Sequence, residues 1–266
     1  NDGSAADYQS GKEIINIGLP FIAVPTTAGT GAEITNNSVI TDTENKIKQS
    51  IRSPFMIAKV AIVDPMLTVS MPPNVTASSG MDALTQAIEN YVSVTTNPFS
   101  DTLALKAITL ISDNLVKAYK NGDDIEAREN MALGSLFGAM AFANAKLGAV
   151  HGLAHPIGAL FDVPHGIICA LLLPYIMEYN LPVRISRYAE ITNAMGIKGK
   201  SDEETARKGI KTIREMLFVM NLPQRLSEFG IKEDDIPLIA RSGKGSSLDN
   251  NPRPANSEAM EEVLKS

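Results

Sequence analysis

Residues 72–91 read PPNVTASSGMDALTQAIENY, and this stretch divides the chain into two parts of different character. Its apolar positions recur every three or four residues, the period of an amphipathic helix, at Ala83, Leu84, Ala87, Ile88 and Tyr91. Thr76 or Ser78 is the expected N-cap, because a side-chain hydroxyl there can accept a hydrogen bond from a free backbone N–H. The two prolines before the helix predict a domain boundary after residue 72.

Beyond this boundary the pattern stays helical to the end of the chain. Helices are expected at Phe99–Lys120, Ile125–Leu147, His151–Leu160, Ile167–Tyr179, Val183–Met195, Asp202–Met220 and Ser257–Lys265. The second of these is rich in Ala and Gly, which favours close packing of neighbouring helices over a wall beside a cavity. Residues 73–266 are therefore predicted to form an all-helical domain.

Residues 1–72 have the pattern of an α/β domain. Short β-branched runs of strand length occur at Leu19–Val24, Ser38–Thr41 and Val60–Val63, with a polar excursion between the last two. The first run leads into a turn of Gly and Thr residues at 26–31. Backbone N–H groups and hydroxyls in such a turn could cradle a phosphate, although an ordinary turn fits the same residues.

The composition favours a cytoplasmic protein with a small-molecule partner. The chain has 266 residues, 24 of them basic and 30 acidic, which gives no electrostatic basis for binding nucleic acid or an anionic membrane. Its single cysteine, Cys169, cannot form an internal disulfide and is interpreted as a core residue. The apolar run around it reaches only Met177 and contains Pro174, which is short for a membrane span of about 20 residues.

All three histidines, His151, His155 and His165, fall within fifteen residues of one another. Imidazole binds transition metals and exchanges protons near neutral pH, so the clustering indicates a chemical site, with three neighbouring structural histidines as the alternative. Asp82 could join them, unless it is a solvated acid in the first turn of its helix; Gln86 follows one turn later. An aspartate and two imidazoles would suit Fe²⁺ or Zn²⁺ with positions open for a substrate.

Several motifs together resemble the iron-containing, or group III, alcohol dehydrogenase family. They occur in the family's order, at 25–33 (PTTAGTGAE), 64–68 (DPMLT), 71–73 (MPP), 80–85 (GMDALT), 151–156 (HGLAHP), 164–166 (PHG) and 251–254 (NPRP). The resemblance implies an α/β domain that binds NAD(P), followed by a helical bundle domain of the dehydroquinate synthase-like fold, with a divalent metal between them. Only the last strands of the dinucleotide-binding domain are expected here, so the chain looks like a fragment that binds NAD(P)H weakly or not at all.

The resemblance also implies roles for individual residues. Asp82, His151 and His165, with Gln86 as a weak fourth candidate, would hold Fe²⁺ or Zn²⁺, which polarises the oxygen of a small alcohol or aldehyde while hydride passes between substrate and nicotinamide. His155 would relay a proton or position the substrate. The residues expected to line NAD or NADP are Thr26, Thr27, Thr30, Thr35, Asn37, Lys48, Leu67 and Thr68. A homodimer is implied by the family as well.

Gln86 departs from the family, whose members usually have a further metal-binding histidine at this position. An amide oxygen is a much weaker ligand for iron or zinc than imidazole, so Gln86 is expected to weaken the site or to act through water. The departure leaves an alternative open, an inactive or metal-poor scaffold that serves as a pseudoenzyme or a binding domain. A lyase on the dehydroquinate synthase scaffold is a third possible function. The Asp-Ala-Leu-Thr and Pro-His-Gly motifs fit a dehydrogenase better.

The substrate pocket is expected to be apolar. Phe142, Phe161 and Val163 are the residues predicted to line it, with no charged group awaiting a carboxylate or a phosphate. This composition favours a small alcohol, diol or aldehyde.

Overall fold

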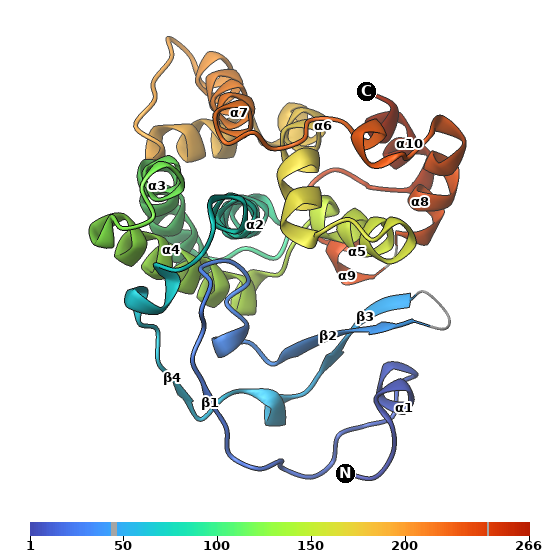
Figure 1. Ribbon diagram of the computed structural model, residues 1–266. Coiled ribbons are helices and arrows are strands. Elements are labelled where there is room, and N and C mark those ends of the chain that lie inside the picture. The colour runs from blue at the N-terminus through green and yellow to red at the C-terminus, as the bar shows by residue number, and fades with distance from the viewer. Residues whose placement is uncertain (44–46, 244) are drawn as a thin grey trace.

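The computed structural model describes residues 1–43, 47–243 and 245–266. Its helices are α1 (Ala5–Gln9), α2 (Pro73–Val92), α3 (Pro98–Lys120), α4 (Ile125–Ala145), α5 (Ala149–Phe161), α6 (His165–Ala194), α7 (Asp202–Val219), α8 (Ile236–Ser242), α9 (Ser246–Asp249) and α10 (Ser257–Lys265). The strands are β1 (Ile22–Ala23), β2 (Asn37–Asp42), β3 (Ile47–Arg52) and β4 (Val60–Ala61). Figure 1 shows a large helical body with the strand-bearing N-terminal segment along one side.

The helical prediction for residues 73–266 is confirmed, with differences in detail. The α10 helix has the expected bounds, and α3, α4, α5 and α7 agree within two residues at each end. The two helices expected at Ile167–Tyr179 and Val183–Met195 are one element, α6, with a kink at Arg184, where φ is −141°. Pro182 lies just before the kink, and proline removes a helical hydrogen bond and clashes with the preceding turn. The short helices α8 and α9 were not predicted.

The expected N-cap of α2 was wrong. The helix begins at Pro73 with Pro72 as its N-cap residue, where the missing N–H of proline is not needed. Thr76 lies inside the helix and accepts a hydrogen bond of 2.9 Å from Nη1 of the buried Arg128. Because α2 starts earlier than expected, Asp82 lies in its middle rather than in its first turn.

The central position of α2 buries it on every side. It packs against α3, α4 and α6, and every residue from Gly80 to Val92 is buried (Figure 1). The interpretation of Asp82 as a solvated acid is therefore wrong, since it is 2% exposed. Polar side chains on such a helix need partners inside the protein, because water cannot reach them.

The α4 helix has the close contacts with a neighbouring helix that its Ala and Gly residues predicted. Its most extensive neighbour is α3, and Gly134 lies so close to it that a Cβ would stand 2.6 Å from Cγ1 of Ile111. After α4 the chain turns through 103° into α5, with Lys146 at a φ of 62°. This sharp bend directs α5, which carries His151 and His155, across the helical body.

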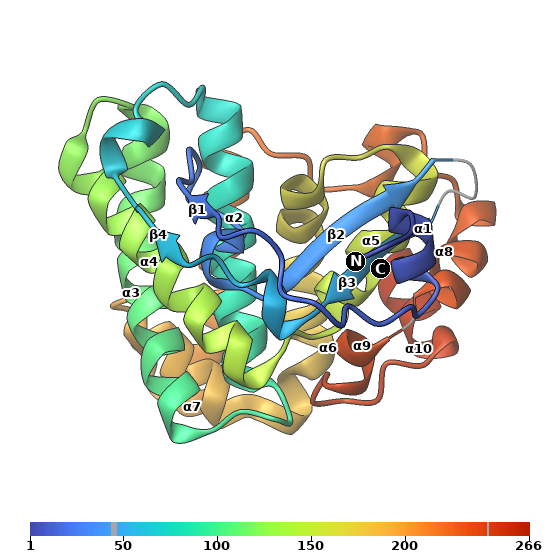
Figure 2. The same ribbon diagram turned by 90° about the horizontal axis from the view of Figure 1, so that it is seen from below.

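The strand-bearing segment forms two small pairs. β1 and β4 are parallel, with Ile22 opposite Val60, whereas β2 and β3 form an antiparallel pair. The expected strands at Leu19–Val24 and Val60–Val63 are shorter than predicted, and β3 lies in the stretch expected to be a polar excursion. The β2–β3 pair lies beside α5 (Figure 2), which contacts β3. The division of the chain into domains at residue 72 stays a prediction.

The α6 helix is longer than the apolar run that predicted it. By length and composition alone it could cross a membrane, but 61% of its most apolar window is buried in the protein. It packs against α2, α5 and α7. This burial is that of the core helix of a globular domain.

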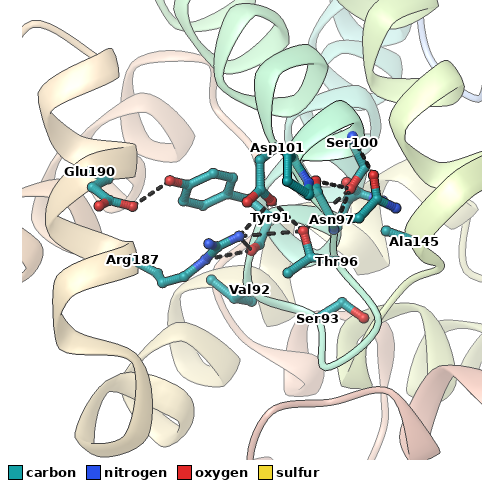
Figure 3. Close-up of polar contacts among 12 residues, drawn as sticks. Tyr91, Val92, Ser93, Thr96, Asn97, Ser100, Asp101, Ala145, Arg187 and Glu190 are labelled. Atoms are coloured by element: carbon teal, nitrogen blue, oxygen red, sulfur yellow. Dashed lines mark hydrogen bonds and ion pairs between the residues drawn. The ribbon is translucent and has the colours of Figure 1, made fainter.

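A polar cluster clamps α6 to α2 and α3 (Figure 3). Arg187 of α6 donates hydrogen bonds to the carbonyl oxygen of Tyr91 at 2.9 and 2.6 Å, and to Asp101 Oδ1 at 2.5 Å. Its guanidinium lies 3.9 Å from the centre of the Tyr91 ring, and the Tyr91 hydroxyl donates to Glu190. The clamp fixes the C-terminal end of α2 relative to α6.

Arg187→Ala is expected to lower the free energy of unfolding by about 2–3 kcal/mol, because it removes charge-assisted hydrogen bonds and a cation–π contact from a mostly buried cluster. Arg207→Ala is the matched control, since Arg207 pairs with Glu203 on the surface of α7, where both side chains are more than half exposed. Its cost should stay below about 0.5 kcal/mol. Urea unfolding of both variants checks this, and equal losses would contradict the clamp.

Candidate metal centre and cofactor cleft

The α2, α5 and α6 helices bring three predicted site residues together. Asp82 Oδ1 lies 3.2 Å from His151 Nε2 and 3.8 Å from His165 Nε2. The side chains of Asp82 and His151 are nearly inaccessible, whereas that of His165 keeps 24% of its exposure. The three residues are far apart in sequence but converge at the junction of their helices, with one edge open to solvent.

Cys169 also belongs to this cluster. The sequence analysis interpreted it as a core residue and did not place it at the site. Its Sγ lies 3.6 Å from His165 Nε2 and 3.9 Å from His151 Nε2. One potential ligand atom from each of Asp82, His151, His165 and Cys169 lies within 4.8 Å of all the others. The signal in the sequence was the four-residue spacing of His165 and Cys169, which places both on one helical face.

Glu89 was missed as well, although it orients His151. Its Oε2 lies 2.6 Å from His151 Nδ1, and its Oε1 accepts a hydrogen bond of 2.6 Å from the backbone N–H of Val150. When His151 donates Nδ1–H to Glu89, its Nε2 keeps a lone pair that faces Asp82 and Cys169. Seven residues separate Asp82 from Glu89, two turns on one face of α2, and this spacing could have found it.

The N-terminus of α5 is held by side chains from elsewhere in the chain. The N–H of Ala149 donates to Oδ1 of Asn251 at 3.3 Å, and Asn251 also exchanges two hydrogen bonds with Asn180, at 2.9 and 2.8 Å. Gly148 leaves room for this arrangement, since a Cβ there would lie 2.8 Å from Glu89 Oε1. These contacts satisfy the free N–H groups of the helix and fix where His151 lies.

The electrostatics of the cluster favour a cation. Burial by itself would raise the pKa of the Asp82 carboxyl, but the hydrogen bond with His151 and the charge of His165 lower it. Burial opposes protonation of His151, yet the neighbouring Cys169, Asp82 and Glu89 raise its pKa well above the ordinary value. The electrostatic effect of Cys169 is the largest influence on His165 and raises its pKa against the effect of burial. A divalent cation would displace protons from these groups.

A cavity of about 350 Å³ opens beside the cluster. Its lining combines residues of the N-terminal segment with residues of α2, α4, α5, α6 and α9 and of the loop between α4 and α5: Thr30, Ala32, Thr35, Asn37, Val39, Ser50, Arg52, Gln86, Phe142, Leu147, His151, His155, His165 and Ser247. Phe142 is there as predicted, whereas Phe161 and Val163 are not in the lining, and Val163 is buried. The expectation of a pocket without a charged group was wrong, because Arg52 lines it.

The predicted cofactor residues separate into two groups. Thr30, Thr35 and Asn37 line the cavity. Thr26 and Thr27 are exposed in the turn after β1, and Leu67 and Thr68 lie in a 3₁₀ helix, Pro65–Thr68, outside that lining. The Thr68 hydroxyl donates to the carbonyl oxygen of Pro65 at 2.7 Å. The backbone of Lys48 belongs to β3, and its side chain lies outside the described part of the structure.

The Gly and Thr turn packs tightly on the helices behind it. Gly31 has a φ of 63°, and a Cβ there would lie 2.0 Å from the Cβ of Ala139 on α4. The Ser135 hydroxyl of α4 donates to the carbonyl oxygen of Gly29 at 3.1 Å. The glycines therefore bring the turn against α4, and this contact holds Thr30 at the cavity.

Several buried polar atoms at the site lack a hydrogen-bond partner among the described residues. They include Oε1 of Gln86, Nδ1 of His165 and Oδ1 of Asn37, which lines the cavity. His155 stacks on His165, with ring centres 5.6 Å apart and planes inclined by 19°. An unpaired buried acceptor is costly, so a ligand or water in the cavity is the expected partner for Gln86.

Two family profiles match most of the chain. The profile of the iron-containing alcohol dehydrogenases matches residues 1–65, and that of the C-terminal part of the Fe-containing alcohol dehydrogenase family matches residues 76–266. The chain belongs to the iron-containing alcohol dehydrogenase family. The resemblance found in its motifs and the predicted fold class are thereby confirmed.

Individual relatives align with the whole length of the chain. The 1,3-propanediol dehydrogenase of Klebsiella pneumoniae is 40% identical over 268 residues, which cover 100% of this chain and 69% of the relative. A crystal structure of a 1,3-propanediol oxidoreductase superposes with a TM-score of 0.95 and 40% identity, over 100% of this chain and 70% of that one. The sulfoacetaldehyde reductase of Bifidobacterium kashiwanohense, in complex with NAD⁺, has a TM-score of 0.89 and 33% identity, with coverages of 100% and 69%.

Proposed function

We propose that the chain carries the metal site of an alcohol dehydrogenase or aldehyde reductase that transfers hydride between a nicotinamide cofactor and a small alcohol or aldehyde. The observation that carries this proposal is the convergence of Asp82, His151 and His165 at one wall of a cavity. A carboxylate and two imidazoles are donors that Fe²⁺ and Zn²⁺ accept. The relatives support the same reaction class, since they include a 1,3-propanediol dehydrogenase and a sulfoacetaldehyde reductase.

A divalent metal at this site would act as a Lewis acid on the substrate oxygen. The protein supports such an ion through Glu89, which holds the His151 ring so that Nε2 faces the site. His155 lines the cavity and stacks on His165, a position from which it can exchange a proton with the substrate oxygen or with water. The burial of Asp82 and His151 excludes water from the inner side of the centre.

The cofactor would enter from the side of the N-terminal segment. Thr30, Thr35 and Asn37 offer hydroxyl and amide groups to the cavity, and Arg52 adds a positive charge that suits the phosphates or the carboxamide end of NAD or NADP. The NAD⁺ complex of the sulfoacetaldehyde reductase supports a nicotinamide cofactor. We propose either NAD or NADP as the cofactor. The proposal also includes a homodimer and a location in the cytoplasm.

Assay of the purified chain tests this function. After anaerobic loading with Fe²⁺ or Zn²⁺, we expect reduction of NAD⁺ or NADP⁺ by 1,3-propanediol or another small primary alcohol, and loss of this activity with a chelator. A protein that binds the metal in stoichiometric amount but turns over no alcohol or aldehyde with either cofactor would contradict the proposal. It would favour the alternative of a binding domain on a dehydrogenase scaffold.

Gln86→His is expected to tighten metal binding by about tenfold or more, because it adds an imidazole nitrogen one helical turn from Asp82, at the edge of the metal centre. Competition with a chromogenic chelator measures the dissociation constants of the two proteins. Gln224→His, in a partly exposed loop after α7, is the matched control and should leave the affinity unchanged. Equal affinities of the wild type and Gln86→His would contradict a role of this position beside the metal.

A further inference from the structure

We propose that Cys169 is the fourth protein ligand of the metal centre, so that the site presents one carboxylate, two imidazoles and one thiolate, and the substrate oxygen would bind as a fifth ligand on the cavity side. The inference rests on the proposed function, since it concerns the same centre. It goes beyond the sequence interpretation, in which Cys169 was a core residue and Gln86 was the fourth candidate.

The distances between donor atoms fit one tetrahedral ion. With metal–nitrogen and metal–oxygen bonds of about 2.1 Å and a metal–sulfur bond of about 2.3 Å, the edges of a tetrahedron are about 3.4–3.6 Å. In the structure Asp82 Oδ1 lies 3.2 and 3.8 Å from the two imidazole Nε2 atoms, and Cys169 Sγ lies 3.9 and 3.6 Å from them. These four distances bracket the expected edges, and the remaining two pairs of donor atoms lie within 4.8 Å of each other.

The packing of α6 on α2 is what brings the thiol to the site. His165 and Cys169 are one turn apart on α6, with Gly166 between them. A Cβ at Gly166 would lie 2.3 Å from the carbonyl oxygen of Ser78 on α2, so only glycine permits this approach of the two helices. Cys169 is completely buried, and its Sγ faces donor atoms of both α5 and α6.

In this arrangement Gln86 is not a metal ligand. It lines the cavity, and its buried Oε1 has no hydrogen-bond partner among the described residues. With the fourth ligand supplied by Cys169, the Gln86 amide is left to accept a hydrogen bond from a substrate hydroxyl or a water molecule. Cys169 then supplies the donor that Gln86 does not provide.

The donor set also has a consequence for the metal. Thiolate is a soft ligand that favours Zn²⁺, so the preferred ion would be Zn²⁺ rather than Fe²⁺. On binding, the Cys169 thiol gives its proton to solvent and its sulfur lone pair forms the bond to the metal. Together with Asp82, the thiolate supplies two negative charges that balance those of the divalent ion.

Substitution with Co²⁺ tests this inference, because a cobalt–thiolate bond gives an intense near-ultraviolet charge-transfer band that oxygen and nitrogen ligands do not give. We expect the wild-type chain to bind Co²⁺ in stoichiometric amount and to show this band. Cys169→Ser should lose the band and bind Zn²⁺ at least about tenfold more weakly. Gln86→Ala is the comparison variant and should keep the band.

The outcomes distinguish the metal centre itself from the role of Cys169 as one of its ligands. Stoichiometric Co²⁺ in the wild type without the band would overturn the role of Cys169 and leave the metal centre standing. Failure of the wild type to bind either Co²⁺ or Zn²⁺ would overturn both the centre and the inference. The wild-type spectrum decides the first question even if Cys169→Ser does not fold.

Discussion

Asp82→Ala is expected to lower the affinity of the chain for Zn²⁺ by about two to three orders of magnitude. Structural zinc sites bind with about 10–16 kcal/mol, so one of four ligands contributes about 2.5–4 kcal/mol on average, and about 1.4 kcal/mol corresponds to a factor of ten. Asp82 is the sole carboxylate in the described set of four donor residues, and its loss also removes a negative charge from a buried site.

Chelator competition measures the effect of Asp82→Ala. Asp113→Ala is the control, because the Asp113 side chain is exposed on α3, and its affinity for Zn²⁺ should equal that of the wild type. Circular dichroism confirms that both variants are helical. An unchanged dissociation constant for Asp82→Ala would place the metal elsewhere or remove it from the protein.

Glu89→Ala is expected to have the second large effect, on stability and on metal affinity together. The substitution leaves the N–H of Val150 and Nδ1–H of His151 buried without an acceptor, at a cost of about 3–5 kcal/mol in the free energy of unfolding. The loss of the group that orients a ligating histidine should weaken Zn²⁺ binding by about 10–100-fold. Urea unfolding and chelator competition measure the two effects.

Glu89→Gln separates these two roles. Its amide oxygen can still accept from Val150, but its NH₂ group would then face His151 Nδ1 and favour the tautomer with the proton on Nε2. The variant should therefore keep most of the stability, with a loss of about 1–2 kcal/mol, and lose metal affinity as strongly as Glu89→Ala. Glu129→Gln, exposed on α4, is the control for both measurements. Wild-type metal affinity in Glu89→Gln would show that the carboxylate acts on the fold alone.

The helical part of the fold could be predicted because its elements are long and periodic. Capping and spacing place α3, α4, α7 and α10 within two residues of their observed ends. The strand β3 escaped prediction because its sequence, Ile47-Lys48-Gln49-Ser50-Ile51-Arg52, is mostly polar and has no β-branched run. The segment is a strand because it pairs with β2, and the local sequence pattern does not predict which segments pair.

The candidate site could be predicted in part from local clustering. His151 and His165 stand out because the chain concentrates its histidines, and Asp82 because it lies on an apolar helix. Glu89 shares a face of α2 with Asp82, and this spacing makes it a candidate, but its contact with His151 spans 62 positions of sequence and follows only from the packing of the helices. The position of Cys169 depends on the close approach of α6 to α2 at Gly166, which is a property of the packed helices.

The most direct test of the metal centre is anomalous diffraction from a crystal of the wild-type chain grown with Zn²⁺, measured at the zinc absorption edge. The structure predicts one strong peak at about 2.0–2.3 Å from Asp82 Oδ1, His151 Nε2, His165 Nε2 and Cys169 Sγ. A difference map without anomalous density among these four side chains, or with its only peaks at the surface, would contradict the proposed centre.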